Sequence, residues 1–350
     1  MTSIIPDRGI SVLPAVPSQY RQIFLRQRPD GIPQPEHFGI RTVPMPELSE
    51  GQFLVRNHYL SVDPAMRGWV SAVGNYSTPV PLGAVMPSYA SGEIVLSHHP
   101  DYEVGSRVMG MLGWQEFAVC NGSEIKRRIQ DKDEPLSLSL GILGLNGFTA
   151  YFGLIDIGAP KDGDVVVVST AAGAVGSAVG QIAKIKGCRV IGIAGGAEKV
   201  RWCKDIGFDD AVDYKRAGFS SQLAALCPNG VNVFFDNTCG AISDAVMPLL
   251  ANGASVVVCG TASVSSWTPW PMGPRVERHL LVKRARMQGF LAMDYEHRYN
   301  EAVICLKNWL YKGRLKHRED ILDGLEGAPG SIRDLYRGDN AGKRLIRLVA

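Results

Sequence analysis

The sequence predicts an α/β protein with two domains, a doubly wound parallel sheet and a smaller β-rich domain. Its 350 residues exceed the roughly 250 residues that a single core usually holds. In the first third of the chain, short alternating strands are interrupted by Pro and Gly about every ten residues. From about residue 136 onward, helical stretches alternate with continuous β-branched runs, as in a parallel sheet covered on both faces.

The first part of the chain predicts a small β-barrel or sandwich. Its strand-like segments are 22–25, 39–43, 53–56, 93–96, 107–110 and 116–119. Turn residues separate them at the spacing that is typical of all-β domains. A last strand-like segment, 344–349, is expected to return to this domain. We therefore expect residues 1–135 and 310–350 to form the β-rich domain, and 136–309 to form the second.

The second part predicts a βαβαβ succession. Continuous apolar runs occupy 164–169, 189–194, 231–236 and 254–259, and helical spacing is found in 175–186, 198–206 and 242–250. A sheet of this kind binds nucleotides at the carboxyl ends of its strands. The sequence therefore places a candidate nucleotide site after these runs.

Composition argues for small-molecule chemistry. Apolar residues make up 45% and charged residues 20% of the chain, and the net charge of +3 is not gathered into a long basic run. Nucleic acid is therefore not expected as a partner. No apolar run approaches the ~18 residues of a membrane span, and no uninterrupted signal-like stretch opens the chain, so we expect a cytoplasmic protein without membrane contact. The seven scattered cysteines contain no C-x-x-C and predict free thiols.

The sharpest local motif is the stretch 168–180, which follows a strand and opens a helix. Gly173 and Gly176 take the second and third positions of a G-x-G-x-x-G fingerprint, and Ala171 takes the first. Glycine at these positions lets backbone amides approach a pyrophosphate and lets the helix close on the strand. The motif predicts a dinucleotide site, against the alternative of a structural glycine turn.

The end of the second run favours NADP(H) over NAD. NAD enzymes usually place a carboxylate there for the ribose 2′-hydroxyl. This chain has no acid at the strand end, and Lys199 follows one residue into the helix, where its charge would attract a 2′-phosphate. Glu198 opposes this interpretation, and Lys199 as a merely solvated helix lysine is the alternative.

Other reaction classes lack their residues. No tyrosine has a lysine four positions later, which excludes a short-chain dehydrogenase. The β-rich region offers one cysteine, Cys120, and four histidines, of which the pair His98-His99 is expected in an exposed turn, so we expect no metal site. The G-x-S-x-G spacing of a serine hydrolase is also missing near Ser177.

Several stretches together suggest a family: 59–68, 144–151, 171–187, 235–237, 294–299 and 338–343. Over nearly the whole chain from about residue 20, the sequence resembles the zinc-independent medium-chain dehydrogenase/reductase superfamily. Within it the chain looks like the alkenal/one oxidoreductases, the group of prostaglandin and leukotriene reductases, plant double-bond reductases and curcumin reductase. The resemblance implies a Rossmann domain, a GroES-like barrel and a homodimer.

The resemblance also implies a set of cofactor residues from separate parts of the chain. Gly173, Ala174, Val175 and Gly176 would hold the pyrophosphate, Lys199 and Tyr214 the 2′-phosphate, Asn237 the cofactor, Cys259 and Thr261 the nicotinamide side, and Phe290, Leu291 and Asn340 would close over the nicotinamide. Alternatives stay open for the last three: Phe290 and Leu291 as core residues, and Asn340 as a turn former.

The chain departs from the family pattern at two places. Ser265 stands where the family has the tyrosine of a Ser-x-Tyr, and Ala65 stands where relatives often have tyrosine. Both changes remove aromatic bulk from the expected pocket and suggest a different or larger substrate. Trp267 and Trp270 could refill it as a lid or be ordinary loop residues. Tyr59, which matches the family's barrel tyrosine, is the first candidate for binding the substrate oxygen, against a structural role.

These observations predict an NADPH-dependent reductase of the C=C bond of α,β-unsaturated ketones and aldehydes. Tyr59, Ser265 and a ribose hydroxyl of the cofactor are the candidate donors to the substrate oxygen. General acid assistance is worth about 10²–10⁴ in rate, so the change at Ser265 would be felt. A zinc-free carbonyl or quinone reductase or alcohol dehydrogenase, and a catalytically silent NADP-binding protein, stay open as alternatives.

Overall fold

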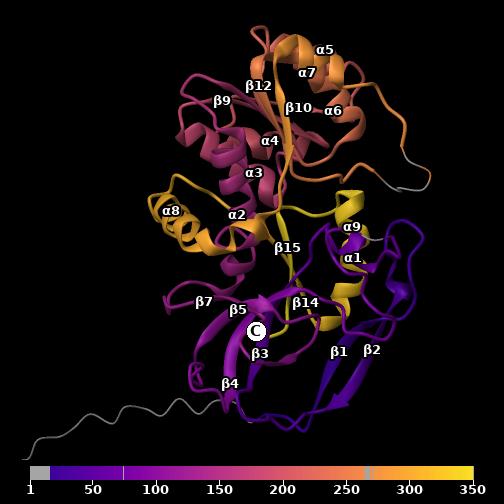
Figure 1. Cartoon of the computed structure of the whole chain (residues 1–350), viewed down its shortest axis with the longest axis vertical. Helices are drawn as coiled ribbons and strands as arrows, with labels where there is room; N and C mark the ends of the chain where they lie inside the picture. Colours follow the sequence, from indigo (N-terminus) through magenta and orange to yellow (C-terminus); the bar gives the residue numbers. More distant parts are fainter. Residues whose placement is uncertain (1–15, 74, 265–268, 270, 350) are drawn as a thin grey trace, which may run out of the picture.

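The chain folds into two lobes joined along a seam. The computed structural model describes residues 16–73, 75–264, 269 and 271–349. One lobe holds a parallel sheet with helices on both faces, and the other holds an antiparallel sheet (Figure 1). Helix α9 (Ala328–Arg337) lies beside α1 (Met66–Val70) between the lobes. This is an α/β fold, as the sequence predicts.

The strands are β1 (Gln19–Leu25), β2 (Phe38–Pro44), β3 (Phe53–Ser61), β4 (Tyr89–Ser97), β5 (Arg107–Met111), β6 (Phe117–Cys120), β7 (Ile125–Arg128), β8 (Val165–Ser169), β9 (Arg189–Ala194), β10 (Asp210–Asp213), β11 (Val231–Asp236), β12 (Leu250–Val258), β13 (Arg286–Gly289), β14 (Glu319–Asp323) and β15 (Lys343–Arg347). The remaining α-helices are α2 (Leu145–Phe152), α3 (Ala174–Ile185), α4 (Ala197–Asp205), α5 (Phe219–Leu226), α6 (Gly240–Val246), α7 (Glu277–Lys283) and α8 (Tyr299–Tyr311). Shorter helical turns are η1 (Pro35–His37), η2 (Leu136–Leu140), η3 (Gly153–Gly158), η4 (Met247–Leu249), η5 (Ala292–Arg298) and η6 (Leu325–Gly327).

The parallel sheet has the order β10-β9-β8-β11-β12-β13. Its central strand β8 is buried on both faces. Val166 and Val168 pack with α2, α3 and α8, while Val167 faces α5 and α6 on the other side. A strand covered on both faces has no polar side, which is why its sequence is a run of valines rather than an alternation.

The antiparallel sheet has the order β14-β15-β3-β4-β5-β7, with β6 also paired to β3; its edge pair β14–β15 is parallel. Its core includes the fully buried Trp114 and Phe53, and α9 adds Ile332 to the same cluster. The last strand, β15, pairs with β3 through Leu345 opposite Ser61. The expected return of the chain's last strand to the β-rich part is therefore confirmed, and we retain 1–135 with 310–350, and 136–309, as the proposed domain boundaries.

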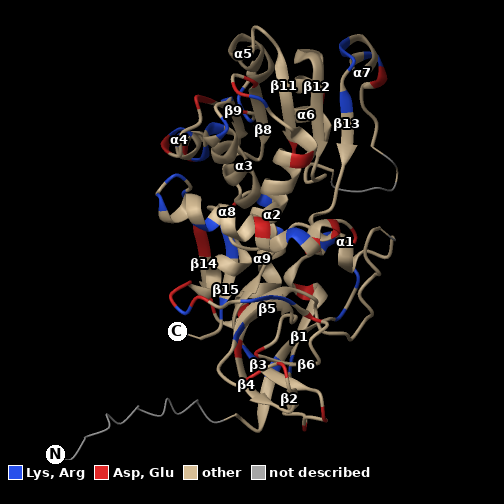
Figure 2. Cartoon of the chain, turned by 60° about the vertical axis from the view of Figure 1, so that its left-hand side comes forward, with Lys and Arg blue, Asp and Glu red and all other residues tan. Residues whose placement is uncertain are grey.

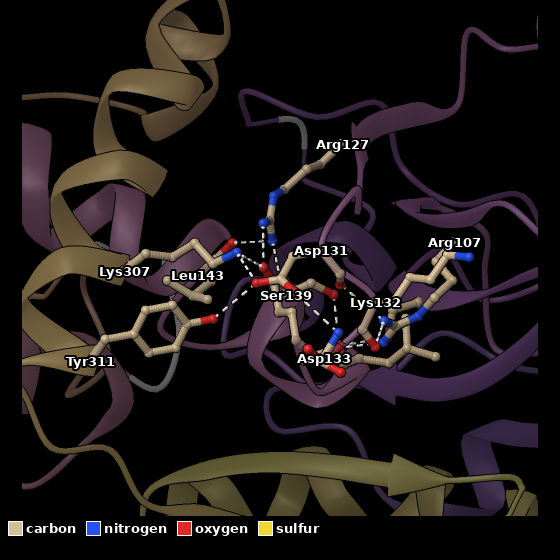
Figure 3. A network of polar contacts seen from close by, with 12 residues as sticks. Arg107, Arg127, Asp131, Lys132, Asp133, Ser139, Leu143, Lys307 and Tyr311 are labelled. Atoms are coloured by element: carbon tan, nitrogen blue, oxygen red, sulfur yellow. Dashed lines mark hydrogen bonds and ion pairs between the residues drawn. The ribbon is translucent and has the colours of Figure 1, made fainter.

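A network of hydrogen bonds and ion pairs joins the two lobes (Figure 3). The linker after β7 carries Glu134, whose carboxylate accepts hydrogen bonds from Arg127 Nη2 at 2.8 Å and lies 2.9 Å from Lys307 Nζ. Lys307 and Tyr311, both on α8, also reach Asp131 at 2.8 and 3.1 Å. Glu134 has no exposed side-chain surface. The network therefore ties the linker to the helix of the other lobe.

The predicted elements compare well with those observed. Every strand-like run overlaps a strand, whereas β7, β10, β13 and β14 were not expected from the sequence. The helix predicted over 242–250 is too long: α6 ends at Val246, and Pro248 lies in a short 3₁₀ turn because its ring cannot continue an α-helix. In the described part of the chain, no helix is long and apolar enough to cross a membrane. Basic and acidic residues are interspersed over both lobes (Figure 2).

Candidate active site

The turn between β8 and α3 holds the four residues expected at the pyrophosphate. Gly173 precedes the first residue of α3, Ala174, and its N–H donates to the carbonyl of Thr170 at 2.9 Å. Thr170 itself adopts a left-handed backbone with φ +52°. A Cβ on Gly176 would lie 2.3 Å from the Thr170 oxygen, so only glycine fits there. The open N–H groups of the α3 N-terminus lie at the carboxyl edge of the sheet, where an anion is favoured.

Lys199 and Tyr214 lie near the ends of β9 and β10, with Gly195 close by. A Cβ on Gly195 would be 2.9 Å from Tyr214 Cε1 and 3.0 Å from Lys215 Cε, so both side chains lie over this glycine. Burial, and after it the charge of Lys215, lower the pKa of the Lys199 ammonium. Two lysines thus gather at this corner, and the sequence reasoning singled out only the first.

The carboxylate of Asp213, at the end of β10, is occupied by backbone groups. Its Oδ1 accepts the N–H of Gly196 at 2.9 Å and the N–H of Lys215 at 3.1 Å. The bond from Gly196 is the main cause that lowers the pKa of the Asp213 carboxyl. Asp213 therefore shapes the loop after β9.

Asn237 is held against the end of β8 by two hydrogen bonds. Its Nδ2 donates to the Ser169 carbonyl and its N–H donates to Ser169 Oγ, both at 2.7 Å. The fully buried Asp236 accepts from Ser169 Oγ at 3.2 Å and from the Thr238 and Cys239 backbone at 2.9 and 3.0 Å. Sequence reasoning missed Asp236, although the polar residue at the end of an apolar run was a visible signal.

Cys259 and Thr261 run beside Asn237. The Cys259 N–H donates to the Asp236 carbonyl at 2.8 Å, and Ala262 N–H donates to the Asn237 carbonyl at 3.3 Å. Burial, with a smaller effect of Asp236, raises the pKa of the Cys259 thiol to about 12, so it is no nucleophile at neutral pH. Ser265, Trp267 and Trp270 lie outside the described residues.

Phe290 and Leu291 follow β13. The Phe290 ring packs edge-on to Phe235 with centroids 6.4 Å apart, and a Cβ on Gly153 would lie 2.4 Å from Phe290 Cζ. Leu291 caps the 3₁₀ turn η5 and is half-buried. Phe290 thus packs against Phe235 and the start of η3, while its side chain is only half-buried.

Asn340 and Lys199 share one pocket, although they lie far apart in the sequence. The pocket measures about 120 Å³, and its lining consists of the turn 338–342 with Ala172, Glu198, Lys199, Trp202 and Arg318. Lys199 Nζ donates to the Gly338 carbonyl at 2.7 Å, and Asn340 Nδ2 donates to the Gly342 carbonyl at 2.7 Å. The structure therefore brings the phosphate-side lysine and the C-terminal turn together, and Asn340 also shapes that turn.

Tyr59 lies in the middle of β3, opposite Ser91 of β4 and Arg347 of β15. It is half-buried and packs against the cluster that contains Tyr89 and Leu345. The Asp323 carboxylate raises the pKa of the Arg347 guanidinium, with a smaller contribution from the Tyr59 phenol. The structure thus places Tyr59 in the antiparallel sheet, beside a cation.

Metal ligands do not gather in the described ranges. Among these residues no group of three or more His, Cys, Asp or Glu side chains could hold a metal ion. The His99 ring packs edge-to-face against Phe53 and Tyr102, and its Nδ1 accepts the Asp101 N–H at 3.1 Å. His98 and His99 therefore belong to a turn, and the expectation of no metal stays a prediction.

Comparisons with known proteins agree with this architecture. Residues 21–127 match a family model described as the N-terminal domain of oxidoreductase, and 174–308 match one described as zinc-binding dehydrogenase. The NADPH-dependent curcumin reductase of Escherichia coli (strain K12) is 43% identical over 335 residues, which cover 94% of this chain and 97% of that protein. The NADP(+)-dependent 2-alkenal reductase of Nicotiana tabacum is 36% identical over 332 residues, covering 93% and 96%.

Among solved structures, CurA from Vibrio vulnificus in complex with NADPH is 44% identical, with a TM-score of 0.89 over 94% of this chain and 99% of that chain. Identity at this level over nearly the full length of both chains exceeds what a shared fold alone would give. The chain therefore belongs to the zinc-independent medium-chain dehydrogenase/reductase superfamily, within the alkenal/one oxidoreductase family.

Proposed function

We propose that the protein is an NADPH-dependent reductase of the C=C bond of α,β-unsaturated ketones and aldehydes. The observation that carries this proposal is full-length similarity to a curcumin reductase and a 2-alkenal reductase, both named as using this cofactor. A turn, a lysine and an asparagine at the carboxyl edge of the parallel sheet supply the matching site.

The site fits a dinucleotide with a 2′-phosphate. Gly176 lets the first turn of α3 pack against the end of β8 at Thr170, and the α3 N-terminus favours the negative charge of a pyrophosphate. Lys199 and Lys215 offer two cations for the 2′-phosphate. Two nearby carboxylates are engaged elsewhere: Asp213 accepts two backbone N–H groups, and Glu198, the acid that opposes this interpretation in the sequence, pairs with Arg318 at 3.2 Å. We propose Tyr214, Asn237, Cys259, Thr261, Phe290, Leu291 and Asn340 as the remaining cofactor residues.

The chain's own residues would stabilise the charge that develops on the substrate oxygen. When bound, NADPH supplies the hydride that the β-carbon of the enone receives. Negative charge then collects on the carbonyl oxygen as an enolate, and a positioned hydrogen-bond donor there lowers the barrier. We propose Tyr59 and Ser265 as donors on the protein side. A proton delivered to the α-carbon completes the saturated product.

A panel of enones and enals tests the proposal. Each compound is incubated with the protein and either NADPH or NADH, cofactor absorbance is followed, and the product is identified by mass spectrometry and NMR. The proposal predicts saturated ketones or aldehydes and a preference for NADPH. An allylic alcohol would instead indicate a carbonyl reductase. NADPH binding without oxidation, with any enone, aldehyde or quinone, would indicate a silent binding protein.

We also propose that two copies associate along β13. In the described part of the chain this strand pairs only with β12, and its four residues are exposed. Leu281 and Val282 of the neighbouring α7 are 79% and 54% exposed. An unpaired edge beside apolar side chains is a typical pairing surface. Light scattering after gel filtration should give twice the chain mass, and Met287→Lys with Leu281→Glu should give the single chain mass. A monomeric wild type would contradict the proposal.

We propose the cytoplasm as the place of action. All seven cysteines are free thiols, four of them buried, which suits a reducing compartment. Fractionation of cells that express the chain should recover it in the cytoplasmic fraction, and recovery elsewhere would contradict this proposal.

A further inference from the structure

Lys343 and Asp63 form a buried ion pair next to the turn 338–342 of the candidate site. Lys343 Nζ donates to Asp63 Oδ1 at 2.6 Å, to Ser61 Oγ at 2.7 Å and to the Val62 carbonyl at 3.1 Å. An ammonium has three N–H donors, and all three are used. Ser61 Oγ in turn donates to the second carboxylate oxygen of Asp63. The two charged side chains are 5% and 9% exposed, and 280 residues separate them in the sequence.

A pair of this kind is a poor way to stabilise a fold. Taking both charges out of water costs several kcal/mol per ion, and neutral residues of similar volume are often as stable. Lys343 stands in β15 beside Leu345 and Ile346, which are fully buried apolar residues. An apolar side chain is therefore compatible with this strand, and the pair needs a reason other than stability.

On the lysine side, the pair adjoins the turn 338–342 that lines the pocket. Gly342 has φ +94°, and a Cβ on it would lie 2.2 Å from the Arg318 carbonyl oxygen. The Lys343 N–H donates to that same carbonyl at 2.9 Å. Lys199 holds the other end of the turn through Gly338. Lys343 thus anchors the end of the turn to the antiparallel sheet, together with Asp320 of β14, whose carboxylate accepts the Ala341 N–H at 3.0 Å.

On the aspartate side, the pair adjoins α1. The Asp63 carbonyl accepts the Met66 N–H at 3.1 Å, which opens this helix. The next carbonyl, that of Pro64, accepts Tyr336 Oη of α9 at 2.9 Å, and the Arg67 guanidinium lies 4.6 Å from the Tyr336 ring centroid. Figure 1 shows α1 beside α9, which leads directly into the turn 338–342. The segment after β3 is therefore held at two points to one C-terminal unit.

We infer that Lys343 is a positioning residue that fixes the turn 338–342 and the segment 63–65 as one rigid unit, so that the cofactor side and the substrate side of the site keep a set spacing. Ala65, at the expected substrate pocket, follows Asp63 by two residues. Asn340, at the expected nicotinamide side, precedes Lys343 by three. Neither Lys343 nor Asp63 needs to touch substrate or cofactor in this role.

The variants are chosen to separate positioning from stability. Lys343→Met with Asp63→Asn removes both charges, keeps both shapes and leaves no unpaired buried charge. Lys343→Met alone leaves the Asp63 carboxylate unpaired. Glu134→Gln is the matched control, because Glu134 is an equally buried carboxylate that pairs with Arg127 and Lys307 away from the pocket. Each variant is measured for its urea midpoint, its NADPH Kd by fluorescence titration, and its kcat with an enone.

We expect the double variant to unfold near the wild-type midpoint. Its Kd for NADPH should rise about tenfold if the turn then holds its binding conformation about a tenth of the time, and its kcat should fall about 10- to 100-fold from misplacement of the two sides. Lys343→Met alone should change Kd and kcat in the same direction, and it should also lower the urea midpoint, because it leaves the Asp63 carboxylate unpaired. Glu134→Gln should lower the midpoint and leave both functional quantities unchanged.

Wild-type Kd and kcat in a folded double variant would overturn the inference. So would a double variant that does not fold, since the fold is argued not to need these charges, or a Glu134→Gln variant that weakens NADPH binding equally. The kcat measurement rests on the proposed function, whereas Kd and the midpoint do not. If the wild type binds NADPH and reduces no enone, the proposed function fails and the Kd of the double variant still decides the role of Lys343.

Discussion

Gly176 lies directly against the carbonyl of Thr170, and a Cβ at position 176 would come within 2.3 Å of that oxygen. The close approach exists because Thr170 turns the chain with φ +52° at the end of β8. The first turn of α3 is thereby brought onto the strand end, with its N–H groups pointing at the carboxyl edge of the sheet.

Gly176→Ala should weaken both folding and NADPH binding. The added methyl group forces the turn away from Thr170 and should lower the free energy of unfolding by about 1–3 kcal/mol. Urea unfolding and an NADPH fluorescence titration measure the two effects. Gly330→Ala is the control, because Gly330 lies in α9 with only ordinary contacts around a new Cβ. Unchanged NADPH affinity in Gly176→Ala would remove this turn from the cofactor site.

Lys199→Ala should reduce the preference for NADPH over NADH. A charged hydrogen bond to the 2′-phosphate is worth about 1.5–3 kcal/mol, so NADPH affinity should fall about 10- to 100-fold while NADH affinity stays the same. Lys204→Ala, on the same helix and paired with Asp210, should change neither. Retained NADPH preference in Lys199→Ala would show that the lysine is only a solvated helix residue.

The affinity for NADPH should also fall at alkaline pH. Burial lowers the pKa of Lys199, because the charged form is disfavoured away from water. Its charge, and with it the attraction for the phosphate, is present below this lowered pKa and lost as the pH rises through it. NADPH Kd measured from neutral to alkaline pH should rise earlier than for Lys199→Arg, which stays charged. A flat profile in the wild type contradicts this expectation.

Tyr59→Phe should lower kcat with an enone and leave the NADPH Kd unchanged. Removing one donor to a developing oxyanion typically costs about 10²–10³ in kcat. Tyr311→Phe, at an exposed position on α8, is the control for removal of a phenol. Undiminished turnover in Tyr59→Phe would leave the tyrosine with the structural role that its place between Ser91 and Arg347 also allows.

Acid should destabilise the protein partly through Glu134. Burial alone would raise the pKa of its carboxyl, but hydrogen bonds and charges from Arg127 and Lys307 outweigh burial and lower it. A carboxyl with a lowered pKa in the folded state contributes stability above its ordinary pKa, and this contribution is lost as the pH falls through the folded-state value. Glu134→Gln should lower the free energy of unfolding by about 3 kcal/mol at pH 7. The urea midpoint of wild type and variant is measured from neutral to acid pH, and it should fall less for Glu134→Gln than for the wild type. An equal fall in both proteins would contradict this role of Glu134.

Strand positions were predictable wherever burial imposed a pattern. The run of valines in β8, for example, indicates a strand that is covered on both faces. β13 was not predictable, because its four residues are exposed and carry no periodicity. The apolar spacing predicts a helix up to residue 250, but α6 ends at Val246 because Pro248 follows.

The candidate site was predictable only where a local motif exists. The spacing of Gly173 and Gly176 predicts their turn, and the absence of an acid at the end of β9 points to Lys199. The shared pocket of Lys199 and Asn340 could be expected only from family resemblance. Asp63 and Lys343 meet across 280 residues, and nothing in either local sequence signals the partner. Long-range polar pairs of this kind have no period to detect.

The pairing of β15 with β3 has a consequence for biosynthesis. β3 leaves the ribosome early, but its partner Leu345 follows Ser61 by most of the chain. At about 5–20 residues per second, the nascent β3 waits for roughly 15–60 s before its neighbour is translated. During that interval its edge is open to other strands, so a chaperone that shields emerging chains should raise the yield of folded protein more than one that acts after release.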